Sequence, residues 1–160
     1  MIEPYFLIKW LHVLSSTILF GFGAGTAYYF WLAHRTQDAR VIASVGRMVV
    51  KADWIFTGIS GIVQPVTGFA LAQLAGMDLR ESWLVASFLL YLMALICWIP
   101  VVALQIKAQR LAAQAVTQGT RLGPDYQCAM RLWFALGWPA FISLLCVFWL
   151  MIARPTLWTH

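Results

Sequence analysis

A histidine lies inside the first long apolar segment of the chain, in the sequence Lys9-Trp-Leu-His12. Between Lys9 and Arg35, His12 is the one residue that easily carries a charge before the very end of the segment. A titratable side chain is costly in a bilayer unless it has a partner or a task, so His12 is a candidate functional residue. A neutral imidazole binds haem iron, and a bundle of apolar helices can hold a haem. The alternative is a histidine that only hydrogen-bonds a neighbouring carbonyl or serine.

Three further residues share a helical face with His12 and complete a predicted haem site. Lys9 lies one turn outward, where its ammonium group could pair with a haem propionate near the membrane surface. Ser16 and Gly23 follow on the same face at helical spacing, and their small side chains leave room beside the helix. In this hypothesis His12 binds the haem iron.

The chain offers no second histidine for the same iron. His34 lies about 33 Å further along a continuous helix, so the two histidines cannot both bind one iron within one chain. The second axial ligand would be a methionine such as Met93 or Met151, a water, or an open position.

Polar residues recur along one face of the second apolar segment. Asp53, Thr57, Ser60 and Gln64 follow steps of four, three and four residues, and Thr67 continues the series. Polar groups aligned over several turns of a membrane helix are expected to face the bundle interior or a polar ligand. They either hydrogen-bond across helices and fix the packing, or line a polar cavity for a cofactor, a quinone or a small solute. The third segment carries a fainter series, Ser87, Tyr91, Trp98 and Gln105.

The elements that must position these residues are four apolar segments, each long enough to cross a bilayer as a helix. The chain is 62% hydrophobic and 11% charged, with a mean hydropathy of +0.78, whereas a soluble domain has about 25% charged residues. Helices alone satisfy their own backbone in segments of this length. We therefore expect one all-α domain over residues 1–160, an up-down bundle of four transmembrane helices. The predicted spans are about 5–34, 54–77, 82–106 and 132–153.

The basic residues are concentrated in two of the predicted loops. The first loop, 35–53, and the third, 107–131, hold eight Lys and Arg residues, against three at the other side of the membrane. Because basic loops stay in the cytoplasm, both termini are predicted outside and the location is an inner membrane. This arrangement argues against nucleic-acid binding. The three cysteines, Cys97, Cys128 and Cys146, have no metal-ligand spacing.

Two glycines in the first segment form a packing motif. Gly21 and Gly25 lie four residues apart, on the far side of the helix from His12. A Gly-x-x-x-Gly pair allows close approach of another helix, in this chain or in a second copy, so the motif predicts a possible homo-oligomer.

The opening motif carries a family resemblance. With Ile8-Lys9-Trp10-Leu11-His12-Val13 and a glycine-rich helix ending in Trp31-Leu-Ala-His34, the whole chain resembles a bacterial family of four-span integral membrane proteins, known only as a domain of unknown function. It is distantly similar to the copper-resistance D-type proteins and the HemJ-type protoporphyrinogen oxidases, which share a Lys-x-x-His motif in the first helix. Pro65-Val-Thr67-Gly68 matches a proline and glycine turn in their second helix.

That distant similarity implies a haem b bound at His12, with Lys9 as the accompanying basic residue. The HemJ-type third helix carries a lysine and a histidine, and the stretch from Ser87 to Trp98 has neither, so protoporphyrinogen oxidation is not implied.

The leading hypothesis is a small protein of the bacterial inner membrane that binds haem b for redox or haem-handling work, with a quinone or a redox protein as partner. If it is an enzyme, it is a membrane haem-linked oxidoreductase. One alternative is a non-enzymatic membrane subunit or assembly factor, and a second is a small-solute or copper-ion transporter.

Overall fold

The computed structural model describes residues 3–158, and these fold into long helices without a strand. The elements in order are α1 (Pro4–Thr36), α2 (Ala39–Ala52), η1 (Asp53–Gly58), α3 (Ile59–Leu74), α4 (Ser82–Gln118) and α5 (Pro124–Ala153). η1 is a π-helical turn, and α2, η1 and α3 form one continuous rod over Ala39–Leu74. The described residues therefore contain four helices long and apolar enough to cross a membrane, which confirms the predicted all-α class.

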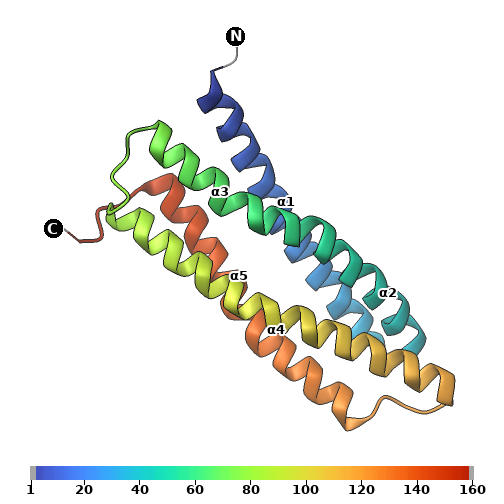
Figure 1. The fold of residues 1–160 in the computed structure, drawn as a ribbon. Coiled ribbons are helices and arrows are strands. Elements are labelled where there is room, and N and C mark those ends of the chain that lie inside the picture. The colour runs from blue at the N-terminus through green and yellow to red at the C-terminus, as the bar shows by residue number, and fades with distance from the viewer. Residues whose placement is uncertain (1–2, 159–160) are drawn as a thin grey trace.

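The four rods alternate in direction, as expected for an up-down bundle (Figure 1). Both ends of the chain lie at one end of the bundle, called here the terminal end. The other end, called the loop end, holds the turn at 37–38 and the connection at 119–123. The orientation expected from the basic loops, with both termini outside, stays a prediction.

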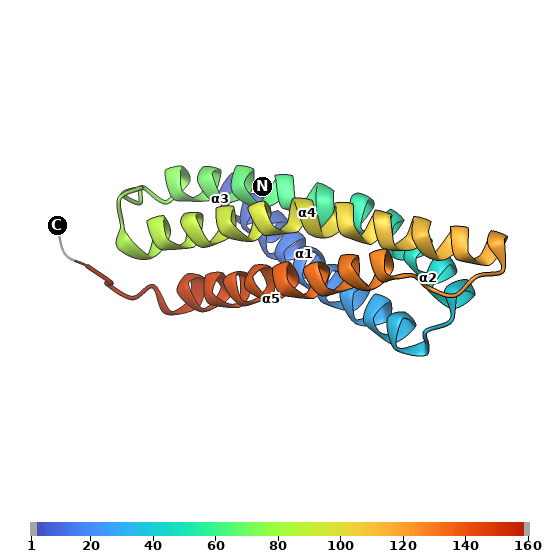
Figure 2. The same cartoon turned by 90° about the horizontal axis from the view of Figure 1, so that it is seen from below.

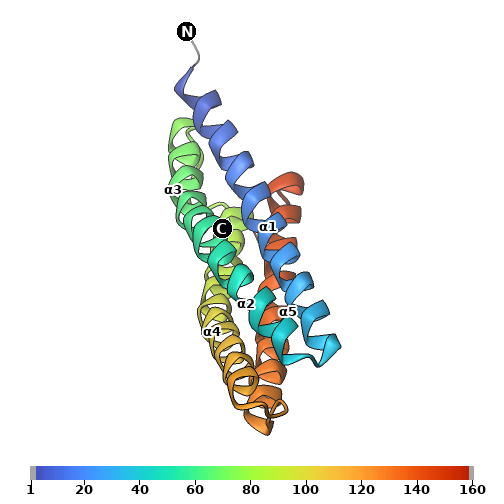
Figure 3. The same cartoon turned by 90° about the vertical axis from the view of Figure 1, so that its right-hand side faces the viewer.

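The helices pack as two pairs that are joined near the loop end. α4 and α5 run side by side along most of their length (Figure 2). α1 lies beside α3 and α2, as the view from the right-hand side shows (Figure 3), and α2 also packs on α4. The rod that begins with α2 therefore links the two pairs.

The first predicted loop, 35–53, is wrong as a loop. Only Gln37 and Asp38 leave helical geometry: Gln37 has a left-handed φ of 52° and ends α1, and the Asp38 carboxylate accepts the Arg40 N–H at 2.8 Å and starts α2. α2 buries Ile42 and Val49 and exposes its bases, so an amphipathic helix interrupts the apolar run without ending the rod.

The third predicted loop, 107–131, is also shorter than expected. α4 continues to Gln118, as its Ala- and Gln-rich sequence indicates, and Gly119 ends it with a left-handed φ of 64°. α5 begins at Pro124, ahead of the apolar span 132–153, because proline is well suited to a first helical turn. Gly123 occupies the cap position before it.

The hydrophobic core is concentrated at the loop end. Its buried members come from all four rods and include Phe30, Ile42, Met130 and Trp133. Large apolar side chains elsewhere are exposed on the outer surface of the bundle, as lipid-facing residues are. The bundle thus presents an apolar surface to a bilayer and closes on itself chiefly at one end.

Gly46 lies where α2 packs tightly against side chains of α1 and α4. A Cβ placed there would lie 3.0 Å from the Gln109 Cβ and 3.0 Å from the Phe30 Cε2. We expect Gly46→Leu to lower the free energy of unfolding by about 1–3 kcal/mol, because overpacking displaces α1 or α4. Thermal unfolding of the detergent-solubilised protein measures this loss. Gly137→Leu is the control, since a Cβ there meets nothing within 4 Å. Equal melting temperatures for the two variants would contradict the prediction.

Candidate functional site

His12 faces α3 and contacts two polar residues and a glycine there. Its Nδ1 lies 2.8 Å from the Thr67 Oγ1, and that hydroxyl also lies 2.7 Å from the backbone oxygen of Val63, one turn earlier in α3. A hydroxyl has one proton to donate. If Thr67 donates it to Val63, then His12 Nδ1 carries its own proton and donates to Thr67. In that arrangement Nε2 is the unprotonated ring nitrogen.

Gln64 fixes the backbone beneath the imidazole. Its Nε2 donates to the backbone oxygen of His12 at 2.7 Å and to the Ser15 Oγ at 2.6 Å. Both amide protons are therefore used, and both bonds join α3 to α1. We call His12, Ser15, Gln64 and Thr67 the His12 cluster.

Gly68 leaves the space that the imidazole occupies. A Cβ on Gly68 would lie 3.2 Å from the His12 Cε1, closer than an ordinary van der Waals contact. The half-buried ring thus rests against the backbone of α3. Its Nε2 makes no hydrogen bond to any part of residues 3–158, so this ring nitrogen has no partner within the cluster.

The other residues predicted for the haem site, Lys9, Ser16 and Gly23, lie on α1, and the contacts of Lys9 and Ser16 are within that helix. Lys9 is exposed towards the terminal end, with its Nζ 5.7 Å from the Tyr5 ring centre. The Ser16 hydroxyl donates to the Val13 oxygen of its own helix at 2.7 Å. A Cβ on Gly23 meets nothing within 4 Å. Ser15, which was not predicted, is the serine that contacts α3; it lies three residues from His12, a spacing as compatible with a shared face as that of Ser16.

A second cluster forms where η1 meets the other helices. The Asp53 side chain is 4% exposed, and its Oδ1 accepts from the Thr26 Oγ1 at 2.7 Å and the Thr57 Oγ1 at 3.2 Å. Its Oδ2 accepts from the Gln105 Nε2 at 2.8 Å, and the Trp133 Nε1 donates to the Gln105 Oε1 at 3.2 Å. These five residues, the Asp53 cluster, join all four rods.

The predicted polar face of the second segment is thus directed at other helices. Asp53, Thr57 and the amide nitrogen of Gln64 form interhelical or local hydrogen bonds. Ser60, on the same face, is buried. Gln105 and Trp133, which complete the Asp53 cluster, belong to other segments. Gln105 was visible in sequence only as one polar residue in the third segment.

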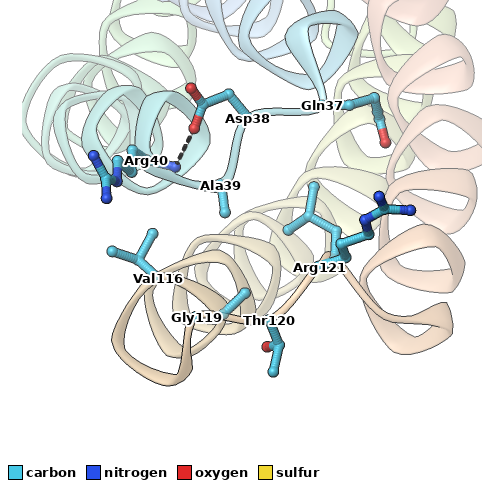
Figure 4. A pocket seen from close by; sticks show the side chains of 10 residues that line it. Gln37, Asp38, Ala39, Arg40, Val116, Gly119, Thr120 and Arg121 are labelled. Carbon is cyan, nitrogen blue, oxygen red and sulfur yellow. Dashed lines mark hydrogen bonds between the residues drawn. The ribbon is translucent and has the colours of Figure 1, made fainter.

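Two further features lie at the loop end. The His34 Nδ1 lies 2.9 Å from the Oη of buried Tyr126, and this contact ties α1 to α5. A hollow of about 530 Å³ lies between the turn at 37–38 and the connection at 119–123. Figure 4 shows Arg40 and Arg121 on opposite sides of it.

Ligand sets for a bare metal ion are not found among the described residues, which contain no group of three or more His, Cys, Asp or Glu side chains placed to hold one.

Comparison with known proteins places the chain in a family. No curated protein and no solved structure matches it, so the distant similarity to the HemJ-type enzymes stays a prediction. A family described as predicted integral membrane protein (DUF2269) matches residues 6–155, nearly the whole chain. The protein therefore belongs to this family of integral membrane proteins.

Proposed function

We propose that this protein binds one b-type haem in the bacterial inner membrane, with His12 as the axial ligand of the iron. The observation that carries the proposal is the hydrogen bond between His12 Nδ1 and Thr67. Histidine ligands of metals almost always donate their second N–H to a neighbour, which sets the tautomer and makes the free nitrogen more basic. The bond to Thr67 leaves Nε2 as that free nitrogen.

The donor set fits a haem held by one histidine. The His34 Nδ1 is hydrogen-bonded to the Tyr126 hydroxyl, which supports a site with one histidine ligand within the described residues. The sixth position would be open or taken by water or a methionine. Lys9 is exposed one turn towards the terminal end, where it could pair with a propionate. The small side chains of Ser16 and Gly23 leave room for the haem along α1. A bound haem supplies one-electron chemistry, and its electrons would come from a quinone or a redox protein.

Each residue of the His12 cluster has a separate task in this proposal. Thr67 orients the imidazole and keeps its Nδ1 protonated, because its own proton is directed to Val63. Gln64 holds the α1 backbone against α3, and Gly68 admits the ring. The cluster as a whole presents a neutral base within a membrane-spanning helix, which is the form that binds iron.

The first test is an absorption spectrum of the detergent-purified protein, oxidised and reduced, with a pyridine haemochrome assay. After expression with ample haem supply we expect a Soret band that shifts on reduction, and His12→Ala should lose it because the ligand is gone. His34→Ala is the matched control and should keep the band. A colourless wild-type protein, or a band retained in His12→Ala, would overturn the proposal.

A second test addresses Thr67. Thr67→Val keeps the shape of the side chain but removes the acceptor for His12 Nδ1. We expect haem affinity to fall about 10- to 100-fold and the reduction potential to rise, because a less basic imidazole stabilises ferric iron less. Haem titration and redox titration measure the two effects. Thr17→Val is the control, since the Thr17 hydroxyl bonds only within α1. Unchanged affinity and potential in Thr67→Val would remove Thr67 from the site.

A packing role is the second candidate, and the uncovered glycines of α1 favour it. A Cβ on Gly21 or Gly25 meets nothing within 4 Å, so the rest of residues 3–158 does not cover this motif. A second copy of the chain, or another membrane subunit, would supply the helix that such a pair accommodates.

We expect the double change Gly21→Leu and Gly25→Leu to lower the oligomeric state, because the added side chains hold a second helix away. Chemical cross-linking in native membranes and native mass spectrometry of the detergent complex would report it. Gly137→Leu, on α5, should leave the oligomeric state unchanged. A wild-type protein that is already monomeric in both measurements would refute this candidate.

A further inference from the structure

The hydrogen-bond directions in the Asp53 cluster can be assigned from chemistry alone. An indole N–H only donates, so Trp133 requires the Gln105 Oε1 as its acceptor. The amide nitrogen of Gln105 must then face Asp53, and it donates to Oδ2. Oδ2 is therefore an acceptor in either protonation state, and any proton held by the carboxyl lies on Oδ1.

Thr26 indicates which state the carboxyl adopts. Its Oγ1 lies 2.7 Å from Asp53 Oδ1 and 2.7 Å from the backbone oxygen of Phe22. One hydroxyl proton cannot fully serve two acceptors at this distance. If Oδ1 carries a proton, Asp53 donates to Thr26 and Thr26 donates to Phe22, and both short contacts become hydrogen bonds. An ionised carboxylate leaves one of them as a contact between two oxygen lone pairs.

Uncharged side chains surround the carboxyl on every element that contacts it. Thr26 faces it from α1, Gln105 from α4 and Thr57 from η1, and Trp133 supports Gln105 from α5. α3 carries no charged residue. Three basic residues lie close in sequence to members of the cluster on α2, α4 and α5, and all three are exposed: Lys51, Lys107 and Arg131. Asp53 forms no ion pair within residues 3–158. A buried ionised carboxylate without a cation is costly.

A metal cation is a poor occupant for the same site. Sodium or potassium would need oxygen ligands around the carboxylate, whereas Gln105 presents its amide N–H to Oδ2. Rotating that amide would offer its oxygen but would also leave the Trp133 N–H facing an NH₂ group. The geometry therefore selects a proton over a cation.

We infer that Asp53 is a proton-binding site of the bundle, separate from the His12 cluster. As the four rods close around it, the carboxylate takes one proton from water and becomes a neutral carboxylic acid, Asp53–COO⁻ + H⁺ → Asp53–COOH. The reverse step releases the proton when the rods separate. The π-helical turn η1 carries Asp53, and such turns are frequent at functional sites. Because the Asp53 cluster joins all four rods, their packing is coupled to this one proton.

Infrared spectroscopy of the whole protein in lipid tests the protonation state directly. At neutral pH we expect a C=O stretching band of a protonated carboxylic acid, above the amide I band, that shifts to lower frequency in D₂O. Asp53→Asn should remove this band. Asp38→Asn, which changes an exposed carboxylate at the turn between α1 and α2, should leave it unchanged. A spectrum without the band, or a band that survives in Asp53→Asn, overturns the inference.

Unfolding as a function of pH tests the coupling to helix packing. An unfolded aspartate loses its proton near about pH 4, so unfolding at higher pH releases the proton that folding takes up. We expect the unfolding equilibrium constant of the wild type to rise by up to about tenfold per pH unit relative to Asp53→Asn, whose amide mimics the neutral acid. Comparing the two proteins cancels the histidines, which are common to both.

The ionic composition of the buffer separates the two possible occupants. The pH dependence should be the same in sodium, potassium and choline chloride at equal ionic strength. If the unfolding equilibrium constants of the wild type and of Asp53→Asn change equally with pH, the inference is overturned. Stabilisation by sodium or potassium alone that is lost in Asp53→Asn would replace the proton with a cation.

Discussion

One buried carboxyl group, Asp53, connects all four rods of this membrane protein. In a bilayer, apolar side chains gain little by leaving lipid for one another, so helix association depends on close packing and on hydrogen bonds between helices. The Asp53 cluster supplies bonds from α1, α4 and η1, and through Gln105 from α5. The hydrophobic core lies towards the loop end, and Gly46 on α2 packs tightly against side chains of α1 and α4. The Asp53 cluster adds a polar contact that all four rods share.

The terminal half of the bundle is held differently. There the His12 cluster joins α1 to α3 only, while α4 and α5 pack chiefly on each other. Phe20 reaches across from α1 to α5 by stacking on Phe141 with ring centres 5.3 Å apart, so aromatic side chains fill part of the distance between the pairs. The same rod therefore carries two polar clusters of unlike design, one that fixes four helices and one that fixes two helices around an imidazole.

Much of this architecture was predictable from sequence, and the errors have physical causes. Hydropathy located the four spans, but it detects only the apolar part of a helix that lies in the bilayer. The amphipathic α2, which extends the second rod beyond its apolar part, was therefore missed. Helical spacing placed Asp53, Thr57 and Gln64 on one face, because their relation is local. Their partners Gln105 and Trp133 lie on other helices, and no spacing within one helix specifies how helices face each other. Ser15 and Ser16 are equally good partners for His12 by periodicity, and only packing distinguishes them.

The difference between the two clusters is the strongest argument that they have different roles. Every polar atom of the Asp53 side chain has a partner supplied by the chain itself, so that cluster is complete without any other molecule. His12 has its Nδ1, its carbonyl and its ring face provided for, yet its Nε2 lacks a donor among residues 3–158. No buried side-chain nitrogen or oxygen among residues 3–158 lacks a hydrogen-bond partner, so the unpaired Nε2 is an accessible atom. Three residues of α3 accommodate the imidazole and leave this nitrogen within reach of a partner from outside the chain.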